Sequence, residues 1–152
     1  MYTVHTSTFS HSRKVHYNRT ARRGRNAALN VVLTEPGGPQ TVSKAVPELA
    51  GKLSGNAVRV PVADVSMAIL NLTLQTKCTK EEINEYLRKI ALHSPLQNQL
   101  GYTESPDAVS SDFIGSREAS ILDATATISN GHNLVLYLWY DNEYGYCNQV
   151  VR

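Results

Sequence analysis

A histidine close to the start of the sequence, His5, is the residue whose chemistry best suits proton transfer. It lies within residues 1–7, where β-branched and aromatic side chains predict a strand. Imidazole has an ordinary pKa of about 6.5, so it can accept or donate a proton near neutral pH. A histidine in a strand is more often structural, and the residue alone leaves both interpretations open.

An arginine inside an apolar stretch, Arg59, is the second candidate. It lies between Val58 and Val60, within a strand predicted over residues 56–63. A cation in apolar surroundings needs an anionic partner, because burial of an unpaired charge is costly. That partner could be an internal carboxylate, such as Asp64 or Asp123, or a bound phosphate.

A polar triplet, Asp141-Asn142-Glu143, follows the strand predicted at residues 134–140. Loops at strand ends often carry the groups that orient a ligand. The other interpretation is a polar turn, which the spacing by itself favours.

The two cysteines, Cys78 and Cys147, lie far apart and in no pairing or zinc-binding motif. They do not form a disulfide scaffold, and a reducing compartment is the default expectation. Cys147 lies in the opening turn of a predicted helix, where thiol pKa values can be low. An ordinary small side chain is the simpler interpretation, and the sequence contains neither a Gly-x-Gly-x-x-Gly nor a P-loop motif.

Positive charge is concentrated near the start of the sequence. No acidic residue precedes Glu35, whereas six cations do: Arg13, Lys14, Arg19, Arg22, Arg23 and Arg25. This asymmetry suggests a negatively charged partner: a nucleic acid, a phosphorylated ligand or an acidic protein face. Tyr17, His11 and His16 alternate with the cations, as on surfaces that bind single strands, but no aromatic-rich strand motif accompanies them.

The length of 152 residues fits one domain, and 41% hydrophobic residues can form a core. The formal net charge of +2 says little by itself. No run reaches the roughly 20 apolar residues of a membrane span, and the sequence has no signal-peptide core and no internal repeat.

The hydrophobic pattern predicts strands that alternate with few helices. Strands are expected at residues 1–7, 31–33, 56–63, 67–76, 121–128 and 134–140. Pro61 indicates an edge or a bend in the third of these. Asn130-Gly131 predicts a hairpin, and the alternation over residues 67–76 predicts a half-buried antiparallel strand.

Three helices are expected. One runs from Pro39 to about residues 47–49 and should bury Val42, Ala45, Val46 and Leu49. Another spans residues 79–92 and begins with a Thr79–Glu82 capping box. A third begins near Gly145, and a short helical turn is expected at residues 95–100. The fold class is therefore α+β, a largely antiparallel sheet with helices on one face.

Taken together, these segments resemble the catalytic domain of glyceraldehyde-3-phosphate dehydrogenase. The blocks that carry the resemblance are residues 3–5, 22–30, 44–49, 51–61, 101–104, 109–113 and 139–146. The last block, Trp-Tyr-Asp-Asn-Glu-Tyr-Gly-Tyr, is the most specific. The blocks keep the family's order and spacing across nearly all of the sequence, which implies the family's fold.

The resemblance implies a role for several residues. His5 matches the histidine that activates a cysteine thiol and acts as general base during hydride transfer from the thiohemiacetal to the nicotinamide. Thr8 and Arg59 match residues that hold the substrate's terminal phosphate. Gly37 matches a glycine whose backbone N–H faces the attacking inorganic phosphate.

The resemblance also implies residues that bind the cofactor. Asn142 matches an asparagine that hydrogen-bonds the nicotinamide carboxamide, and Tyr146 matches the aromatic residue beside that ring. Residues 9–30 match the long loop that lines a neighbouring subunit's cofactor pocket. Pro36 stands where the family usually has Thr, and proline supplies neither the hydroxyl nor the N–H that would contact the attacking phosphate.

The resemblance also implies features of a larger enzyme. The family's Ser-Cys-Thr-Thr-Asn block and its Rossmann domain precede the histidine strand and are not in this sequence. We therefore expect residues 1–152 to be a catalytic domain truncated at both ends and inactive alone.

The implied whole is a phosphorylating, NAD- or NADP-dependent enzyme of glycolysis. It is expected to be a cytoplasmic homotetramer that acts on a phosphorylated aldose and inorganic phosphate. The alternative is a non-catalytic module that binds an anion or RNA.

Overall fold

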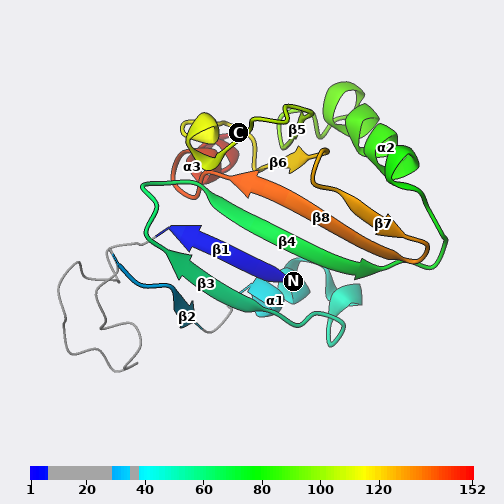
Figure 1. Ribbon diagram of the computed structural model, residues 1–152, viewed down its shortest axis with the longest axis horizontal. Helices are drawn as coiled ribbons and strands as arrows, with labels where there is room; N and C mark the ends of the chain where they lie inside the picture. The colour runs from blue at the N-terminus through cyan, green and yellow to red at the C-terminus, as the bar shows by residue number, and fades with distance from the viewer. Residues whose placement is uncertain (7–28, 35–37) are drawn as a thin grey trace. The chain divides into compact units, whose positions relative to one another are not determined.

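The computed structural model describes residues 1–6, 29–34 and 38–152. These residues form three α-helices and β-strands that pair in both parallel and antiparallel orientation (Figure 1). The chain divides into two units, Met1–Ala63 and Asp64–Arg152. The described residues confirm the predicted α+β class. Within these residues, no helix is both long and apolar enough to cross a bilayer.

The first unit has a three-stranded arrangement with β3 in the middle. Its elements are β1 (Tyr2–Thr6), β2 (Val32–Thr34), α1 (Gly38–Ala45), the 3₁₀ helix η2 (Pro47–Leu49) and β3 (Asn56–Val60). β3 pairs with β1 in parallel and with β2 in antiparallel orientation. Of the two alternatives predicted from Pro61, the edge position is therefore wrong, whereas the bend is confirmed at Pro61 itself. Because β3 ends at Val60, Pro61 lies beyond the paired residues of the strand. Its lack of an N–H group therefore removes no hydrogen bond between β3 and its neighbours.

The helix predicted from Pro39 to residues 47–49 is shorter than expected. α1 ends at Ala45, and Val46 has φ −129° and ψ 83°, outside the helical region. Pro47 explains this end, because a proline disfavours the α conformation of the residue before it. None of the four residues predicted to be buried is fully buried: Val42 and Leu49 are partly buried, Ala45 is exposed and Val46 is 41% exposed.

The second unit is a five-stranded arrangement around β8. Its elements are β4 (Ser66–Thr73), α2 (Lys80–His93), β5 (Leu100–Thr103), the 3₁₀ helix η3 (Ser110–Phe113), β6 (Ser120–Asp123), β7 (Ile128–Asn130), β8 (Asn133–Tyr140) and α3 (Tyr144–Val151). β8 pairs antiparallel with β4, β6 and β7, and β5 runs parallel to β6. The predicted hairpin is confirmed, but its turn residues are Gly131 and His132, because Asn130 ends β7 and is paired to Asn133; Gly131 has φ +63°.

The single strand predicted over residues 121–128 is divided into β6 and β7. The Asp123 carboxylate explains the break, because its Oδ1 accepts hydrogen bonds from Thr125 Oγ1 (2.6 Å) and Ala126 N (3.2 Å). This local turn competes with continued strand pairing. β5 was not predicted: residues 95–99 form turns, and an extended strand begins at Leu100.

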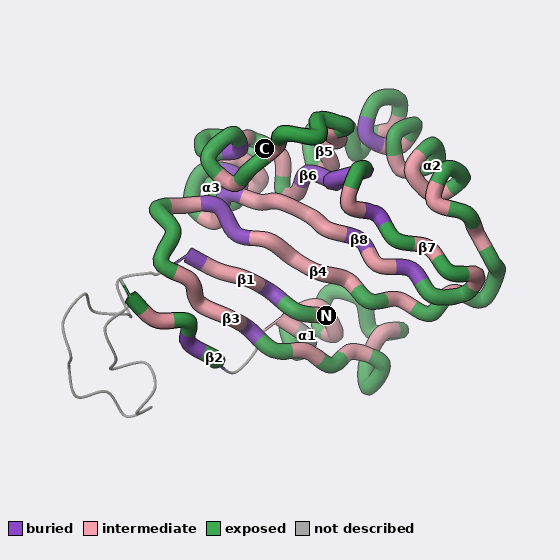
Figure 2. The backbone as a smooth tube through the Cα atoms, in the orientation of Figure 1, coloured by how far each residue is buried: buried purple, intermediate pink, exposed green. Residues whose placement is uncertain are grey.

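Helix α2 covers one face of the second unit's strands. Its Thr79 cap forms the predicted capping box, with Thr79 Oγ1 accepting from Glu82 N and Thr79 N donating to Glu82 Oε2. Leu122, Leu134 and Leu136 are buried on this face (Figure 2), and these partly buried side chains pack against them: Leu70, Leu72, Leu74, Ile83, Leu87, Tyr102 and Leu138.

The opposite face of the same strands has a smaller core. Neighbouring residues of a strand point to opposite faces, so Ile121 and Trp139 lie on the face away from α2. They pack with Phe113 of η3 and with Val65. The Phe113 and Trp139 rings are stacked, with centroids 5.5 Å apart.

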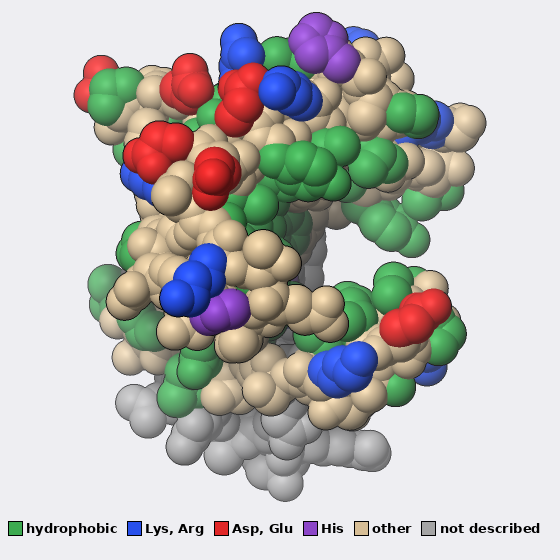
Figure 3. Space-filling model, turned by 90° about the vertical axis from the view of Figure 1, so that its right-hand side faces the viewer, with side chains coloured by type: hydrophobic (Ala, Val, Ile, Leu, Met, Phe, Trp, Pro, Cys, Tyr) green, Lys and Arg blue, Asp and Glu red, His purple; other side chains and the backbone are tan. Residues whose placement is uncertain are grey.

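The solvent-facing side of α2 carries charges of both signs. Glu85 lies 3.3 Å from Lys89 and 3.9 Å from Arg88. Acidic and basic side chains lie next to one another in the upper part of the space-filling view (Figure 3). Such a mixed surface is typical of a solvated helix face.

Candidate functional site

His5 and Arg59 lie side by side in the first unit. β1 and β3 are parallel, and their register pairs His5 with Arg59 and Thr3 with Ala57. All four side chains therefore belong to one face of the two strands, on which Thr3 and Ala57 are buried. Both His5 and Arg59 are partly buried, so the two candidate residues share one environment.

The Arg59 side chain is held by the strand that carries the histidine. Arg59 Nη1 donates a hydrogen bond to the carbonyl oxygen of Thr6, at 3.2 Å. Thr6 is itself fixed, because it is 4% exposed and its Oγ1 donates to the carbonyl oxygen of Val62 at 3.0 Å. The guanidinium is thereby held by the backbone of β1, the strand that carries His5.

This environment keeps the His5 ring neutral. Burial and, as the smaller cause, the positive charge of Arg59 together lower the pKa of His5 from 6.5 to about 4. Both causes act against the imidazolium form. A neutral ring carries one unprotonated nitrogen, so its protonation state at pH 7 is that of a general base rather than a general acid.

Of the two internal carboxylates considered as partners of Arg59, Asp123 is already used within the second unit. Its Oδ1 accepts from Thr125 and Ala126, and its Oδ2 accepts from Trp139 Nε1 at 3.2 Å. This carboxylate therefore holds the turn between β6 and β7.

The second group of candidate residues lies where β8 passes into α3. Asp141 is 3% exposed and directly precedes Asn142, which is partly buried. Tyr146 lies in the first turns of α3 and is 68% exposed. An amide at a strand end and an exposed aromatic ring nearby are groups that could contact a flat polar ligand.

The Asp141 carboxylate organises this turn. Its Oδ1 accepts from Glu143 N at 3.0 Å and from Tyr144 N at 2.6 Å, and its Oδ2 accepts from Gly115 N at 2.9 Å. The first two bonds satisfy N–H groups at the start of α3, which have no acceptor within the helix. The polar turn is thus present, and it also places Asn142 in a fixed backbone.

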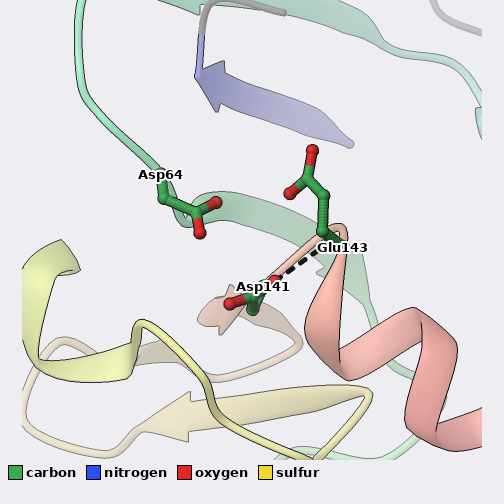
Figure 4. Close-up of side chains that lie close together, drawn as sticks. All are labelled: Asp64, Asp141 and Glu143. Atoms are coloured by element: carbon green, nitrogen blue, oxygen red, sulfur yellow. Dashed lines mark hydrogen bonds between the residues drawn. The ribbon is translucent and has the colours of Figure 1, made fainter.

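Three carboxylates gather near this turn (Figure 4). Oxygen atoms of Asp64, Asp141 and Glu143 lie within 4.8 Å of one another. Although Glu143 is exposed, partial burial of its carboxyl and the neighbouring Asp64 raise its pKa. Oxygen ligands of this kind could hold a hard cation. However, the hydrogen bonds from backbone N–H groups to Asp141 already explain why that carboxylate is there.

Several predicted residues lie outside the described part of the chain. These are Thr8, Gly37, Pro36 and the basic residues 13–25. Their proposed roles remain predictions. Of the two cysteines, Cys78 is partly buried and Cys147 is exposed on α3.

Gly145 and Gln149 contribute to this site but were not predicted to do so from the sequence. Both lie on α3 and meet residues 115–118, about 30 residues away in the sequence. A glycine within a predicted helix was the available signal, because glycine there is unfavourable unless packing requires it. No comparable signal marks Gln149.

Comparison with known proteins gives one family for most of the chain. The family model described as "Glyceraldehyde 3-phosphate dehydrogenase, C-terminal domain" matches residues 1–142. A "Glyceraldehyde-3-phosphate dehydrogenase-like protein" of Pseudomonas aeruginosa (strain UCBPP-PA14) is 53% identical over 150 residues, covering 99% of this chain and 32% of that protein.

Two eukaryotic relatives extend this likeness. Glyceraldehyde-3-phosphate dehydrogenase 2 of Danio rerio is 47% identical over 130 residues, which is 85% of this chain and 38% of that protein. Glyceraldehyde-3-phosphate dehydrogenase 1 of Saccharomyces cerevisiae (strain ATCC 204508 / S288c) is 45% identical over 131 residues, 86% of this chain and 39% of that protein. The chain therefore spans between about a third and two fifths of the length of these relatives.

Proposed function

The chain belongs to the glyceraldehyde-3-phosphate dehydrogenase C-terminal domain family, and on this premise we propose that it supplies the general base and the substrate-phosphate contacts of such a dehydrogenase. The proposed reaction is the oxidation of a phosphorylated aldose to an acyl phosphate, with NAD or NADP as oxidant and inorganic phosphate as second substrate. The thiol nucleophile would come from the rest of a complete enzyme, by which we mean a polypeptide that carries this domain together with that thiol. The observation that carries the proposal is the neutral His5 held beside Arg59.

His5 would act on the hydroxyl of the substrate bound to that thiol. Since burial and Arg59 hold the pKa of His5 at about 4, the ring is unprotonated at pH 7, which is the form a general base requires. The proton on the substrate hydroxyl would move to the unprotonated ring nitrogen as the C–H bond breaks. Arg59 would bind the terminal phosphate of the substrate, and the fixed guanidinium would then position the aldehyde carbon relative to the base.

The residues of the β8–α3 turn fit a nicotinamide ring. The Asn142 amide has both a donor and an acceptor, which matches a carboxamide, and Tyr146 offers an exposed aromatic face. NAD or NADP, when bound, would accept the hydride. Asn142 would orient the ring, and Tyr146 would exclude water from one side of it.

Replacing His5 in the complete enzyme tests the proposal. His5→Gln should lower kcat about 10²- to 10⁴-fold, as expected when a general base is lost. His93→Gln is a matched control, because His93 is exposed at the end of α2 and distant in sequence from the site. Near-normal turnover by the His5 variant would contradict the proposed role.

The 152-residue chain by itself is expected to lack dehydrogenase activity. Its two cysteines offer no thiol with the family's Ser-Cys-Thr-Thr-Asn surroundings. Turnover by the purified chain, measured as reduction of NAD or NADP with glyceraldehyde-3-phosphate and phosphate, would show that the nucleophile lies within it.

The remaining part of the proposal concerns the assembly of the complete enzyme and its place in the cell. We propose that the complete enzyme is a homotetramer that acts in glucose metabolism in the cytoplasm. Sedimentation of the complete enzyme would test the assembly, with a four-chain species as the expected result.

A further inference from the structure

Residues 115–118, which we call the supporting loop, contact both the turn before α3 and α3 itself. We propose that the supporting loop and Asp141 are positioning elements that fix Asn142 and Tyr146 for the nicotinamide cofactor. This inference rests on the proposed function, and it concerns residues that do not themselves touch the cofactor.

The first contact holds the backbone on both sides of Asn142. Asp141 precedes Asn142 and Glu143 follows it. The buried Asp141 carboxylate accepts from Glu143 N at 3.0 Å on one oxygen and from Gly115 N at 2.9 Å on the other. Hydrogen bonds to an ionised acceptor are stronger than neutral ones. The turn that carries Asn142 is therefore tied directly to the supporting loop.

The second contact brings α3 against the supporting loop at a distance that favours glycine. A Cβ atom added at Gly145 would lie 2.7 Å from the carbonyl oxygen of Glu118 and 3.3 Å from that of Ser116. Both neighbours are backbone atoms, which cannot move aside as the end of a flexible side chain can. Gly145 directly precedes Tyr146, so this close approach sets the position of the Tyr146 backbone.

The third contact lies one helical turn further along α3. Gln149 Nε2 donates to the carbonyl oxygen of Arg117 at 2.9 Å and to that of Asn98 at 2.9 Å. Residues 145 and 149 are four apart and therefore lie on the same side of the helix. This side of α3 meets the supporting loop, while Tyr146 remains 68% exposed and available to a ligand.

These three contacts have one feature in common. Each joins the supporting loop to a residue that is adjacent to Asn142 or Tyr146 or lies one helical turn from them. A small displacement of a positioning group can weaken binding or catalysis far more than its own contacts would suggest. Because its contacts reach residues beside Asn142 and Tyr146, the supporting loop should affect cofactor binding.

Variants of the complete enzyme test this inference. Gln149→Met keeps the length of the side chain but removes both hydrogen bonds. Asp141→Asn leaves one acceptor oxygen, so it cannot serve Gly115 and the start of α3 together. We expect each to raise the Kd for NAD or NADP about 3- to 10-fold, the effect of losing one or two net hydrogen bonds. The KM for the aldose phosphate should stay the same.

Asn148→Ala is the matched control. The Asn148 amide donates to the carbonyl oxygen of Tyr144 within α3, at 2.8 Å, and its loss should leave the cofactor Kd unchanged. Gly145→Ala adds a steric test, because its methyl group must push α3 away from the supporting loop. Gln149→Met is the variant that keeps the test valid if Asp141→Asn fails to fold.

The outcomes separate this inference from the proposed function. If Asn142→Ala leaves the cofactor Kd unchanged, the proposed cofactor contact and the positioning role are both overturned, while the role of His5 is tested separately by His5→Gln. If Asn142→Ala raises the Kd but folded Gln149→Met and Gly145→Ala do not, only the positioning role is overturned. Equal increases in the cofactor Kd and the substrate KM would indicate a general loss of structure and would also overturn it.

Discussion

The pairing of His5 with Arg59 makes a quantitative prediction about one proton. Arg59→Met removes the positive charge beside His5 but leaves a side chain of similar length on β3. The pKa of His5 should then rise from about 4 toward 6.5. It should remain below 6.5, because burial is the larger of the two causes and is still present.

The magnitude follows from the two pKa values. With a pKa of about 4, roughly 0.1% of His5 is protonated at pH 7, whereas an unperturbed ring with pKa 6.5 would be about one quarter protonated. Wild-type His5 should therefore show no change in protonation between pH 6 and pH 8. The Arg59→Met variant should begin to titrate at a higher pH than the wild type.

NMR titration of the histidine ring protons in the 152-residue chain measures this directly. His5→Gln assigns the His5 signal by its disappearance. Arg59→Lys is the matched control, because it keeps the charge, and its His5 should stay close to the wild-type pKa. A wild-type His5 that titrates near 6.5, or an Arg59→Met variant with an unchanged pKa, would refute the reasoning.

The lowered pKa of His5 also predicts how the free energy of unfolding depends on pH. The unfolded chain binds a proton at His5 below about pH 6.5, while the folded chain resists it down to about pH 4. The free energy of unfolding should therefore fall as the pH drops from 6.5 through 4. The full difference between the two pKa values corresponds to about 3 kcal/mol of unfolding free energy. The loss should be smaller than this, because His5 is only partly buried and solvent screens its charge. His5→Gln should remove this part of the pH dependence.

Three further predictions concern the second unit, each measured by chemical denaturation. Thr79→Ala removes the α2 cap and should cost about 1 kcal/mol of unfolding free energy, whereas Thr76→Ala at an exposed turn should cost little. Leu122→Ala should cost about 2–5 kcal/mol, because Leu122 is 0% exposed; the same change at Leu92, 48% exposed, should have a much smaller effect. Glu143→Gln should gain stability relative to wild type as the pH rises above 4.5. The pKa of Glu143 is raised in the folded chain, so its ionisation opposes folding in this range. A stability difference that does not change with pH would contradict this.

Features encoded over a few neighbouring residues could be predicted from the sequence. The α2 helix is one, since its capping box and apolar spacing lie within residues 79–92, and the structure gives Lys80–His93 with that cap. The hairpin between β7 and β8 is another, because the glycine at its two-residue turn, Gly131-His132, lies next to both strands in the sequence. Such signals do not depend on distant contacts.

Features that depend on distant contacts were predicted poorly. The central position of β3 follows from its pairing with β1 and β2. Pro61 predicted an edge or a bend, and only the bend is present, because the strand ends before the proline. The break between β6 and β7 depends on Asp123, whose side chain also accepts from Trp139 of β8. In both cases local propensity was correct, but tertiary pairing decided where the element ended.

For the candidate site, too, local sequence predicts only part of the chemistry, and the rest depends on distant contacts. His5 could be identified as a possible base from its type, but its neutrality at pH 7 depends on burial and on Arg59, 54 residues away in the sequence. Likewise, Asn142 could be identified from a local motif, whereas the contacts at Gly115 and Gln149 that hold its surroundings appear only in the fold. A motif therefore predicts which groups are present, and the fold determines their protonation and position. For this reason, variants that leave every motif residue unchanged, such as Gln149→Met, are the strictest test of how the site works.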